Sequence, residues 1–192
     1  MTGPATGATG AAPVLLIGGG AGSGKSALAR GLAAADPDLT VVHLDDFYHC
    51  DPDAGVTVEK LDGTGRVLDR AHPGSLDLAR ALAAVDRARA ARAVVVEGVF
   101  ALCFAELRER AALSVYVDTP DDVRLARKML RKLAAGEPDA ALMLRNHLHF
   151  SRPRHEQHIA PTRRHADLVL DGLRPVPGLV AATAAALAAA AY

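Results

Sequence analysis

A glycine-rich segment near the start of the chain constrains its fold more than any other feature. The segment GGGAGSGKS, residues 18–26, follows an apolar run at 14–17 and precedes a stretch with helical periodicity. Its last eight residues fit the pattern G-x-x-x-x-G-K-[ST], which forms a phosphate-binding loop (P-loop) between a strand and a helix. Inward-pointing backbone N–H groups and the helix dipole both favour an anion there. We therefore expect the nucleotide phosphates to bind at Gly19, Gly20, Ala21, Gly22, Ser23, Gly24, Lys25 and Ser26.

A flexible linker is the alternative that such a glycine content suggests. A linker gives no reason for an apolar run before it, or for Lys25 and Ser26 at the start of a helix. In a phosphate-binding loop both side chains have a role, because the lysine reaches the β- and γ-phosphates and the hydroxyl can bind Mg²⁺. The sequence therefore favours a loop that binds nucleotide.

Short apolar runs alternate with longer helical stretches along the whole chain. The runs lie at 14–17, 40–44, 93–97, 113–118 and 167–170, and the helical stretches at 25–35, 76–91, 101–110, 120–135, 139–158 and 176–190. Such alternation predicts an α/β protein of the P-loop NTPase fold, with a five-stranded parallel sheet and helices on both faces. Nearly continuous apolar runs predict strands that are buried on both faces. We expect one domain over residues 13–192, a disordered lead-in at 1–12, and a functional or mobile loop at 48–75.

Composition excludes several classes of function. The chain has 22 basic and 22 acidic residues, so its overall charge favours neither nucleic acid nor a membrane surface. Its two cysteines form neither a metal-binding nor a disulfide pattern. The N-terminus lacks the basic and apolar regions of a signal peptide. We therefore expect a cytoplasmic protein with a small-molecule partner.

Acidic residues follow two of the predicted strands, at the sheet edge where α/β proteins bind ligands. Asp45 in the segment LDDFY can accept a proton from a substrate hydroxyl, although an Asp there can also cap a turn. Tyr48 is either a core residue or an aromatic wall of the substrate site. Glu97 ends the run AVVVE and predicts a Mg²⁺ ligand; the alternative is an exposed strand terminus.

Basic side chains are concentrated between residues 120 and 165. The row that includes Lys128 and Arg131 is either a solvated helix face or part of a small helical lid, about residues 128–150, that closes on ATP. Five histidines follow, but their spacing does not match a metal-binding motif, and Mg²⁺ prefers oxygen ligands. Arg152 and Arg154 are better candidates for contact with an anion.

Five blocks in this order resemble the uridine kinase / phosphoribulokinase family of P-loop kinases, and are most similar to uridine kinases. They are GGGAGSGKS, LDDFY, VVVEGVFAL, VDTPDDVRLARKMLRK and SRPRHEQHIAPTRRHADLVL, and they span residues 14–171. The resemblance implies an ATP- and Mg²⁺-dependent kinase that phosphorylates a primary hydroxyl, with uridine or cytidine as first choice. It also implies Asp45 as the base, Tyr48 as a pocket wall, Ser26 and Glu97 as Mg²⁺ ligands, and Lys128 and Arg131 as lid contacts to phosphate or adenine. With Lys25, Arg131 is expected to stabilise charge during transfer.

The segment LDRAHPGSLD, residues 68–77, departs from the family pattern at the acceptor site. Ala71 stands where the family has an Asp that binds the ribose hydroxyls, and Asp69 can replace it only if the loop shifts. His72 is retained, and Asn146 lies where a Gln is common. The family's base-binding hairpin has no room between residues 82 and 93.

The expected acceptor contacts are therefore Asp45, Tyr48, Asp69, His72, Asn146 and Arg152. Because the family pattern breaks there, other acceptors stay open: nicotinamide riboside, pantothenate, a sugar or glycerate. A nucleotide-binding regulatory protein without turnover is the alternative from another functional class. The sequence leaves self-association open.

Overall fold

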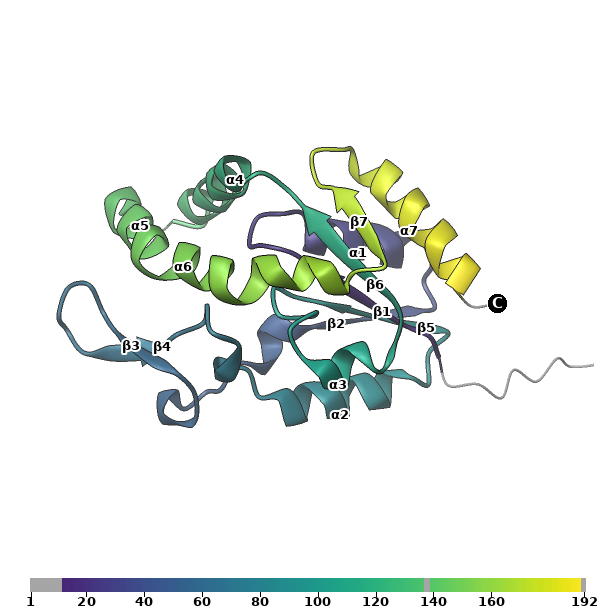
Figure 1. Ribbon diagram of the computed structural model, residues 1–192, viewed down its shortest axis with the longest axis horizontal. Coiled ribbons are helices and arrows are strands. Elements are labelled where there is room, and N and C mark those ends of the chain that lie inside the picture. Colours follow the sequence, from purple (N-terminus) through teal and green to yellow (C-terminus); the bar gives the residue numbers. More distant parts are fainter. Residues whose placement is uncertain (1–11, 137–138, 191–192) are drawn as a thin grey trace, which may run out of the picture.

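The computed structural model describes residues 12–136 and 139–190, so the lead-in expected at 1–12 lies, apart from Ala12, outside the described residues. Its main sheet has five parallel strands in the order β2-β5-β1-β6-β7 (Figure 1). This confirms the predicted α/β fold. The strands are β1 (Val14–Gly18), β2 (Leu39–His43), β5 (Ala93–Glu97), β6 (Ala111–Asp118) and β7 (Leu168–Asp171).

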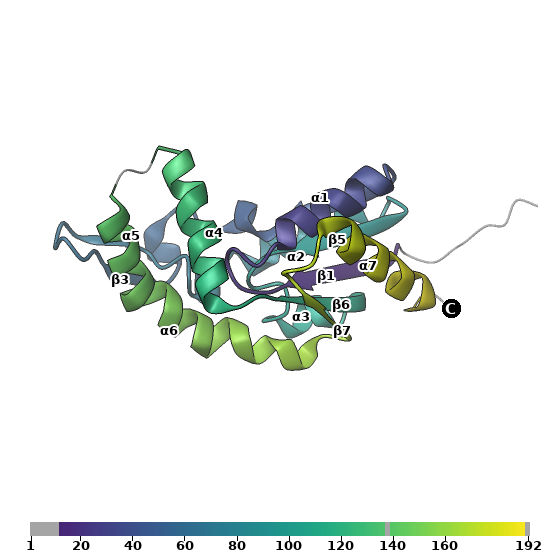
Figure 2. The same cartoon turned by 90° about the horizontal axis from the view of Figure 1, so that it is seen from above.

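Helices cover both faces of this sheet, as Figures 1 and 2 show. Side chains alternate between the two faces along a strand, and β1 illustrates this. Leu15 and Ile17 belong to the core cluster on the side of α1 and α7, whereas Val14 and Leu16 belong to the cluster on the side of α2 and α3. The helices are α1 (Lys25–Ala35), α2 (Leu78–Ala88), α3 (Ala105–Arg108) and α7 (Val176–Ala190).

The edge strands differ from the expectation that all five strands are buried. Every residue of β1 and β5 is buried, but in β2 only Val42 is, and in β7 only Leu170. An edge strand has one neighbouring strand instead of two, and its apolar residues pack mainly against one layer of helices. Apolar composition alone therefore overestimated the burial of β2 and β7.

The range 48–75, expected to be an irregular loop, contains an antiparallel hairpin of β3 (Thr57–Glu59) and β4 (Arg66–Leu68). The Asp62 carboxylate accepts hydrogen bonds from both the backbone N–H and the hydroxyl of Thr64, which fixes the turn. Residues 82–93 contain the end of α2 and the start of β5. The chain therefore has a hairpin before α2, and not between residues 82 and 93, where the family's hairpin would be expected. Two short 3-10 helices flank it, η2 (Pro52–Ala54) and η3 (Pro73–Ser75).

A helical hairpin projects beyond the sheet beside β3 and β4 (Figures 1 and 2). It consists of α4 (Asp121–Ala134) and α5 (Ala140–Asn146). From α5 the chain continues as one helical rod to residue 165, seven residues beyond the expected end. Pro153 lacks an N–H and lies between two π-helical segments, which accommodate the interruption of the α-helical hydrogen bonds. The rod comprises α5, η4 (His147–Ser151), α6 (Arg152–Arg154), η5 (His155–Ile159) and η6 (Ala160–His165).

The helical hairpin overlaps the segment 128–150 that is expected to be a lid, and closure of that lid stays a prediction. Within the described ranges, the helices lack the combination of length and apolarity that crossing a membrane requires.

Candidate active site

The glycine-rich segment forms a tight loop between β1 and α1. Ser23 N–H donates to the Gly20 carbonyl (3.1 Å), and helix α1 begins at Lys25. At Gly22, φ is +82°, and an added Cβ would lie 2.4 Å from the Arg124 carbonyl oxygen. Glycine is thus required both by the backbone conformation and by the close approach of α4. The first N–H groups of α1 have no acceptor within the helix, so the loop has the properties expected of an anion nest.

Lys25 is buried and lies over this loop. Its Nζ donates to the Gly20 carbonyl at 3.0 Å, and only 6% of the residue is exposed. Burial lowers the Lys25 pKa to about 8; Glu97 and Asp45 oppose this shift, and Arg124 and Arg131 add to it. A bound polyphosphate would supply negative charge beside this ammonium group and favour its protonated form.

Residues at the start of α4 attach that helix to the loop. The Thr119 hydroxyl donates to the Ser23 carbonyl at 3.0 Å. The buried Arg124 donates from Nε to the Thr119 carbonyl and from Nη1 to the Ala21 carbonyl, and pairs with Asp121. Sequence reasoning treated Arg124 as one member of a basic row. Its spacing to Asp121 was the available signal for the ion pair, but the contact with the loop depends on the fold.

Glu97 ends β5 beside the end of β2. The strand register pairs it with His43, and His43 Nδ1 lies 2.8 Å from one Glu97 carboxylate oxygen, Oε1. The carboxylate is buried, with 7% of the residue exposed. In the neutral imidazole with a proton on Nδ1, His43 donates this hydrogen bond and orients the carboxylate. Sequence reasoning did not identify His43.

The donor atoms in this region fit Mg²⁺. Glu97 provides a second carboxylate oxygen, and Ser26 in the first turn of α1 provides a hydroxyl. The described residues contain no group of three or more His, Cys, Asp or Glu that could hold a metal ion. Mg²⁺ commonly uses one or two protein ligands together with water and substrate phosphates. Ser26 and Glu97 would therefore hold it only with the nucleotide.

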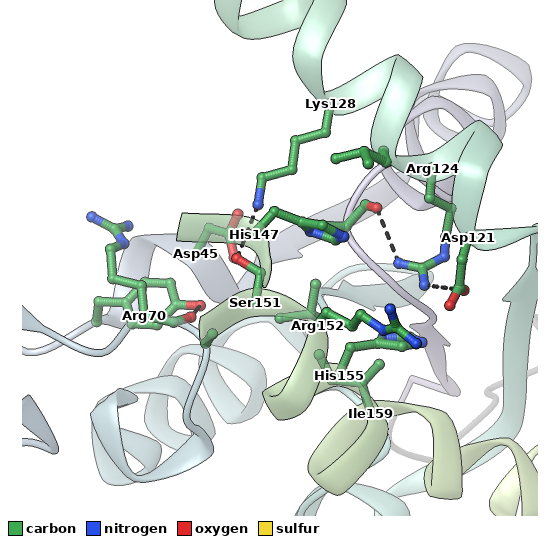
Figure 3. A pocket seen from close by; sticks show the side chains of 15 residues that line it. Asp45, Arg70, Asp121, Arg124, Lys128, His147, Ser151, Arg152, His155 and Ile159 are labelled. Atoms are coloured by element: carbon green, nitrogen blue, oxygen red, sulfur yellow. Dashed lines mark hydrogen bonds and ion pairs between the residues drawn. The ribbon is translucent and has the colours of Figure 1, made fainter. Parts of the chain in front are cut away.

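A pocket of about 270 Å³ lies between the loop, the end of β2 and the helical rod (Figure 3). Asp45 is exposed in η1 (Leu44–Phe47) and lines the pocket, as does Ala21 of the phosphate-binding loop. Four of the predicted site residues thus share this pocket with the loop: Asp45, Tyr48, Lys128 and Arg152. Sequence reasoning considered Arg124 only as part of the basic row, and it did not assign to the site the pocket residues Arg70, Asp121, His147, Ser151 and His155.

Tyr48 is both a packing residue and a pocket wall, so the two alternatives left by the sequence combine. Its ring meets that of Phe100 edge-on, with centroids 6.5 Å apart, while Tyr48 also lines the pocket. Its hydroxyl donates to the Arg70 carbonyl at 2.8 Å. Burial, followed by the nearby Asp45, raises the Tyr48 pKa, which keeps this phenol protonated.

Two histidines line the side of the pocket formed by the rod. Burial lowers the His155 pKa to about 4, with Arg124 as the next cause. Burial and the nearby Lys128 also lower the His147 pKa. Lys128 itself donates to the Ser151 hydroxyl at 3.2 Å. Both imidazoles are thus neutral near pH 7, and the pocket's positive charge comes from lysine and arginine.

Several predicted contacts lie outside this pocket. Asp69 is turned inward, with 3% of the residue exposed, and pairs with Arg154 at 2.8 Å. His72 accepts the Gly74 N–H and packs edge-on against another histidine ring. Both side chains therefore have partners outside the pocket. The loop shift that would let Asp69 take the place of the family's ribose-binding Asp is not seen. Asn146 lines grooves beside α5, and Arg131 lies on an exposed part of α4.

Comparison with known proteins extends these observations. Residues 68–176 match the model of the "Phosphoribulokinase / Uridine kinase family". The uridine kinase of Deinococcus deserti is 40% identical over 77 residues, which span 40% of this chain but only 37% of that protein. The uridine kinase of Clostridium novyi is 27% identical over 181 residues, spanning 82% of this chain and 86% of that protein.

Two solved structures support the fold. One is assigned as a fructose transport system kinase from Silicibacter sp. TM1040, with TM-score 0.61, 23% identity, and coverage of 86% of this chain and 92% of the other. The second is a gluconokinase from Sinorhizobium meliloti 1021, with TM-score 0.56, 21% identity and 93% coverage of both chains. At these identities they establish the fold alone. The family match covers more than half of the chain, and the chain therefore belongs to the phosphoribulokinase / uridine kinase family.

Proposed function

We propose that the chain is a small-molecule kinase that transfers the γ-phosphate of ATP to a primary hydroxyl, with Mg²⁺ as cofactor. One observation carries this proposal: the loop residue Ala21 and the carboxylate of Asp45 line the same pocket. A hydroxyl bound in that pocket would lie between a proton acceptor and the phosphate-binding loop. That is the arrangement needed for in-line phosphoryl transfer.

In the proposed phosphoryl transfer, each group of site residues has a separate role. Asp45 accepts the proton of the attacking hydroxyl, and Lys25 with the loop amides stabilises charge on the phosphates. Ser26 and Glu97 would hold Mg²⁺, which would neutralise phosphate charge when bound. Lys128 and Arg131 close over the phosphates as part of a lid at about residues 128–150.

Uridine is the acceptor that the names of the relatives suggest, and cytidine is the second nucleoside that the sequence resemblance implies. One observation favours a second candidate class, another small hydroxyl compound. Asp69, the carboxylate nearest to the family's ribose-binding position, is already paired with Arg154. Nicotinamide riboside, pantothenate, a sugar and glycerate therefore belong in the test panel. A cytoplasmic location is part of the proposal and agrees with both cysteines being free.

The proposal is tested by substrate-dependent ADP formation with Mg·ATP, first with the acceptor panel and then with Asp45→Asn. Loss of a positioned general base typically costs about 10²- to 10⁴-fold in rate, so kcat should fall by that factor with ATP affinity retained. Asp46→Asn is the matched control, since Asp46 is exposed and does not line the described pocket. Equal effects of the two variants would refute the role of Asp45. Tight Mg·ATP binding without turnover of any acceptor would favour a regulatory protein.

A further inference from the structure

The charged groups of the pocket are mostly cationic. Four cationic side chains line it: Arg70, Arg124, Lys128 and Arg152. Its carboxylates are Asp45 and Asp121, and Asp121 is paired with Arg124. Apart from the proposed base, the carboxylate among the described lining residues is thus already paired with a guanidinium through one of its oxygens.

Arg70 differs from two of the other cationic side chains because it forms no ion pair within the described residues. Arg152 pairs with Glu156 at 2.9 Å, and Arg124 pairs with Asp121. The Arg70 guanidinium instead lies over the Tyr48 ring, with Cζ 4.3 Å from the ring centroid. A guanidinium held in this way presents several N–H donors and can bind a carboxylate or phosphate through two parallel hydrogen bonds.

Tyr48 fixes Arg70 from two directions. The ring supports the guanidinium, and the Tyr48 hydroxyl donates to the Arg70 carbonyl at 2.8 Å. Tyr48 follows Asp45 by three residues, and both line the pocket. The proposed base and the guanidinium thus lie on the same wall, where they could contact two groups of one small molecule. Figure 3 shows Arg70 at the edge of the pocket, with Asp45 nearer its centre.

The neighbouring carboxylate does not neutralise Arg70. Asp69 is not among the residues that line the pocket; its Oδ2 pairs with Arg154 and its Oδ1 accepts the Ala71 N–H. The segment that would bind a diol in a nucleoside kinase therefore presents a cation here. A neutral polyol would gain little from it, whereas an anionic group would gain a charge-assisted hydrogen bond.

We infer that the acceptor carries a carboxylate or phosphate in addition to the reacting hydroxyl, and that Arg70 binds this anionic group. The inference rests on the proposed kinase function and names its substrate class. The carboxylate and phosphate forms share the chemistry that Arg70 recognises. Compounds with one carbon skeleton and different end groups distinguish them.

The experiment compares glycerol, glycerate and glycerol 3-phosphate, then ribitol, ribonate and ribitol 5-phosphate, with uridine as the nucleoside reference. Turnover is measured as acceptor-dependent ADP formation. Binding is measured by calorimetry on the full chain saturated with Mg²⁺ and a non-hydrolysable ATP analogue, so that the phosphate-binding loop is occupied. We expect at least one anionic compound to exceed its neutral counterpart about tenfold or more in kcat/KM and in affinity.

Arg70→Met keeps an unbranched apolar stem over Tyr48 and removes the charge. It should raise KM for the anionic acceptor about tenfold to a hundredfold, while KM for ATP and turnover of neutral compounds change little. Arg70→Lys should recover part of the loss. Arg30→Gln is the control, because Arg30 is an exposed residue of α1 outside the pocket. A merely structural role of Arg70 would impair neutral and anionic acceptors alike.

The outcomes separate this inference from the kinase proposal. If uridine or another neutral compound is the best acceptor, the kinase proposal stands and the inference is overturned. An Arg70→Met defect that is equal for all acceptors, or that appears in KM for ATP, also overturns it. If no compound turns over, Arg70-dependent binding of the anionic compounds supports the anion site while the kinase proposal fails. Absence of both turnover and anion binding overturns both.

Discussion

The ion pair between Asp69 and Arg154 should make its two partners unequal in their effect on stability. The Asp69 side chain is 2% exposed and that of Arg154 is 28% exposed, with 2.8 Å between Arg154 Nε and Asp69 Oδ2. Removing Arg154 leaves a buried carboxylate whose remaining hydrogen-bond donor, within the described residues, is the Ala71 N–H. Removing the charge of Asp69 leaves a guanidinium that already reaches solvent and still donates to Gln157 at 3.1 Å.

The exposed fractions of the Asp69 and Arg154 side chains determine how much the two variants should differ in free energy of unfolding. Loss of one partner from a buried ion pair costs roughly 3–5 kcal/mol, and partial exposure of Arg154 places this pair at the low end. We expect Arg154→Met to lower the free energy of unfolding by about 3 kcal/mol. Asp69→Asn should cost about 1 kcal/mol, because the amide oxygen can still accept the Ala71 N–H.

Chemical denaturation of both single variants and the double variant measures this difference. Adding Asp69→Asn to Arg154→Met should recover about 2 kcal/mol, since the buried charge is then gone. Arg152→Met is the control, because its ion pair with Glu156 is exposed and should contribute no more than about 0.5 kcal/mol. Equal losses in the two single variants, or strict additivity in the double variant, would refute the reasoning.

Three further predictions concern the nucleotide site. Mg·ATP binding at pH 9 should take up protons, because the Lys25 pKa is about 8 in the free protein and bound phosphate favours the ammonium form. The uptake should vanish below about pH 7, where Lys25 is already protonated. Calorimetry in buffers of different ionisation enthalpy measures the number of protons taken up. Gly22→Ala should cost about 1–3 kcal/mol of stability and weaken ATP binding. Gly178→Ala in α7 is the control and should be neutral or stabilising, because a Cβ there has open space. Equal unfolding midpoints of the two variants would contradict this. His43→Phe should raise the Mg²⁺ concentration needed for half-maximal ATP binding about tenfold, because it removes the hydrogen bond that orients Glu97; an unchanged Mg²⁺ titration would exclude that role.

The fold was predictable because its signals are local, and the residues proposed for the donor side of the site were also chosen from local signals. The loop motif lies within nine residues, and the ends of parallel strands meet at one edge, which places Asp45 and Glu97 together. The hairpin formed by β3 and β4 was missed because a strand of three residues is too short to show a clear alternation of apolar and polar residues. Its turn sequence DGTG, residues 62–65, was a usable signal.

The acceptor side depends on contacts between distant parts of the chain. Asp69 and Arg154 are 85 residues apart, and nothing in the local sequence indicates that one neutralises the other. The inward turn of Asp69 follows from this pairing, and so does the identity of the charge that faces the pocket. Similarly, Arg124 contacts the phosphate-binding loop across 103 residues. Such pairings are determined by the packing of the helical rod and α4, and single-sequence patterns do not encode them.

The phosphate-binding loop and the acceptor-binding residues of the pocket lie on different segments of the chain, and this affects how the family can evolve. Among the described residues, those that line the pocket include none from the central strands β1 and β5. Arg70 is exposed and Ala71 is half-buried, and both follow the hairpin of β3 and β4, which is a two-stranded sheet separate from the main one. Substitutions there act on an accessible segment and leave the core clusters intact. We therefore expect acceptor preference to diverge among homologous chains through few changes at these positions, at little cost to folding, while the sheet and the phosphate-binding loop stay the same.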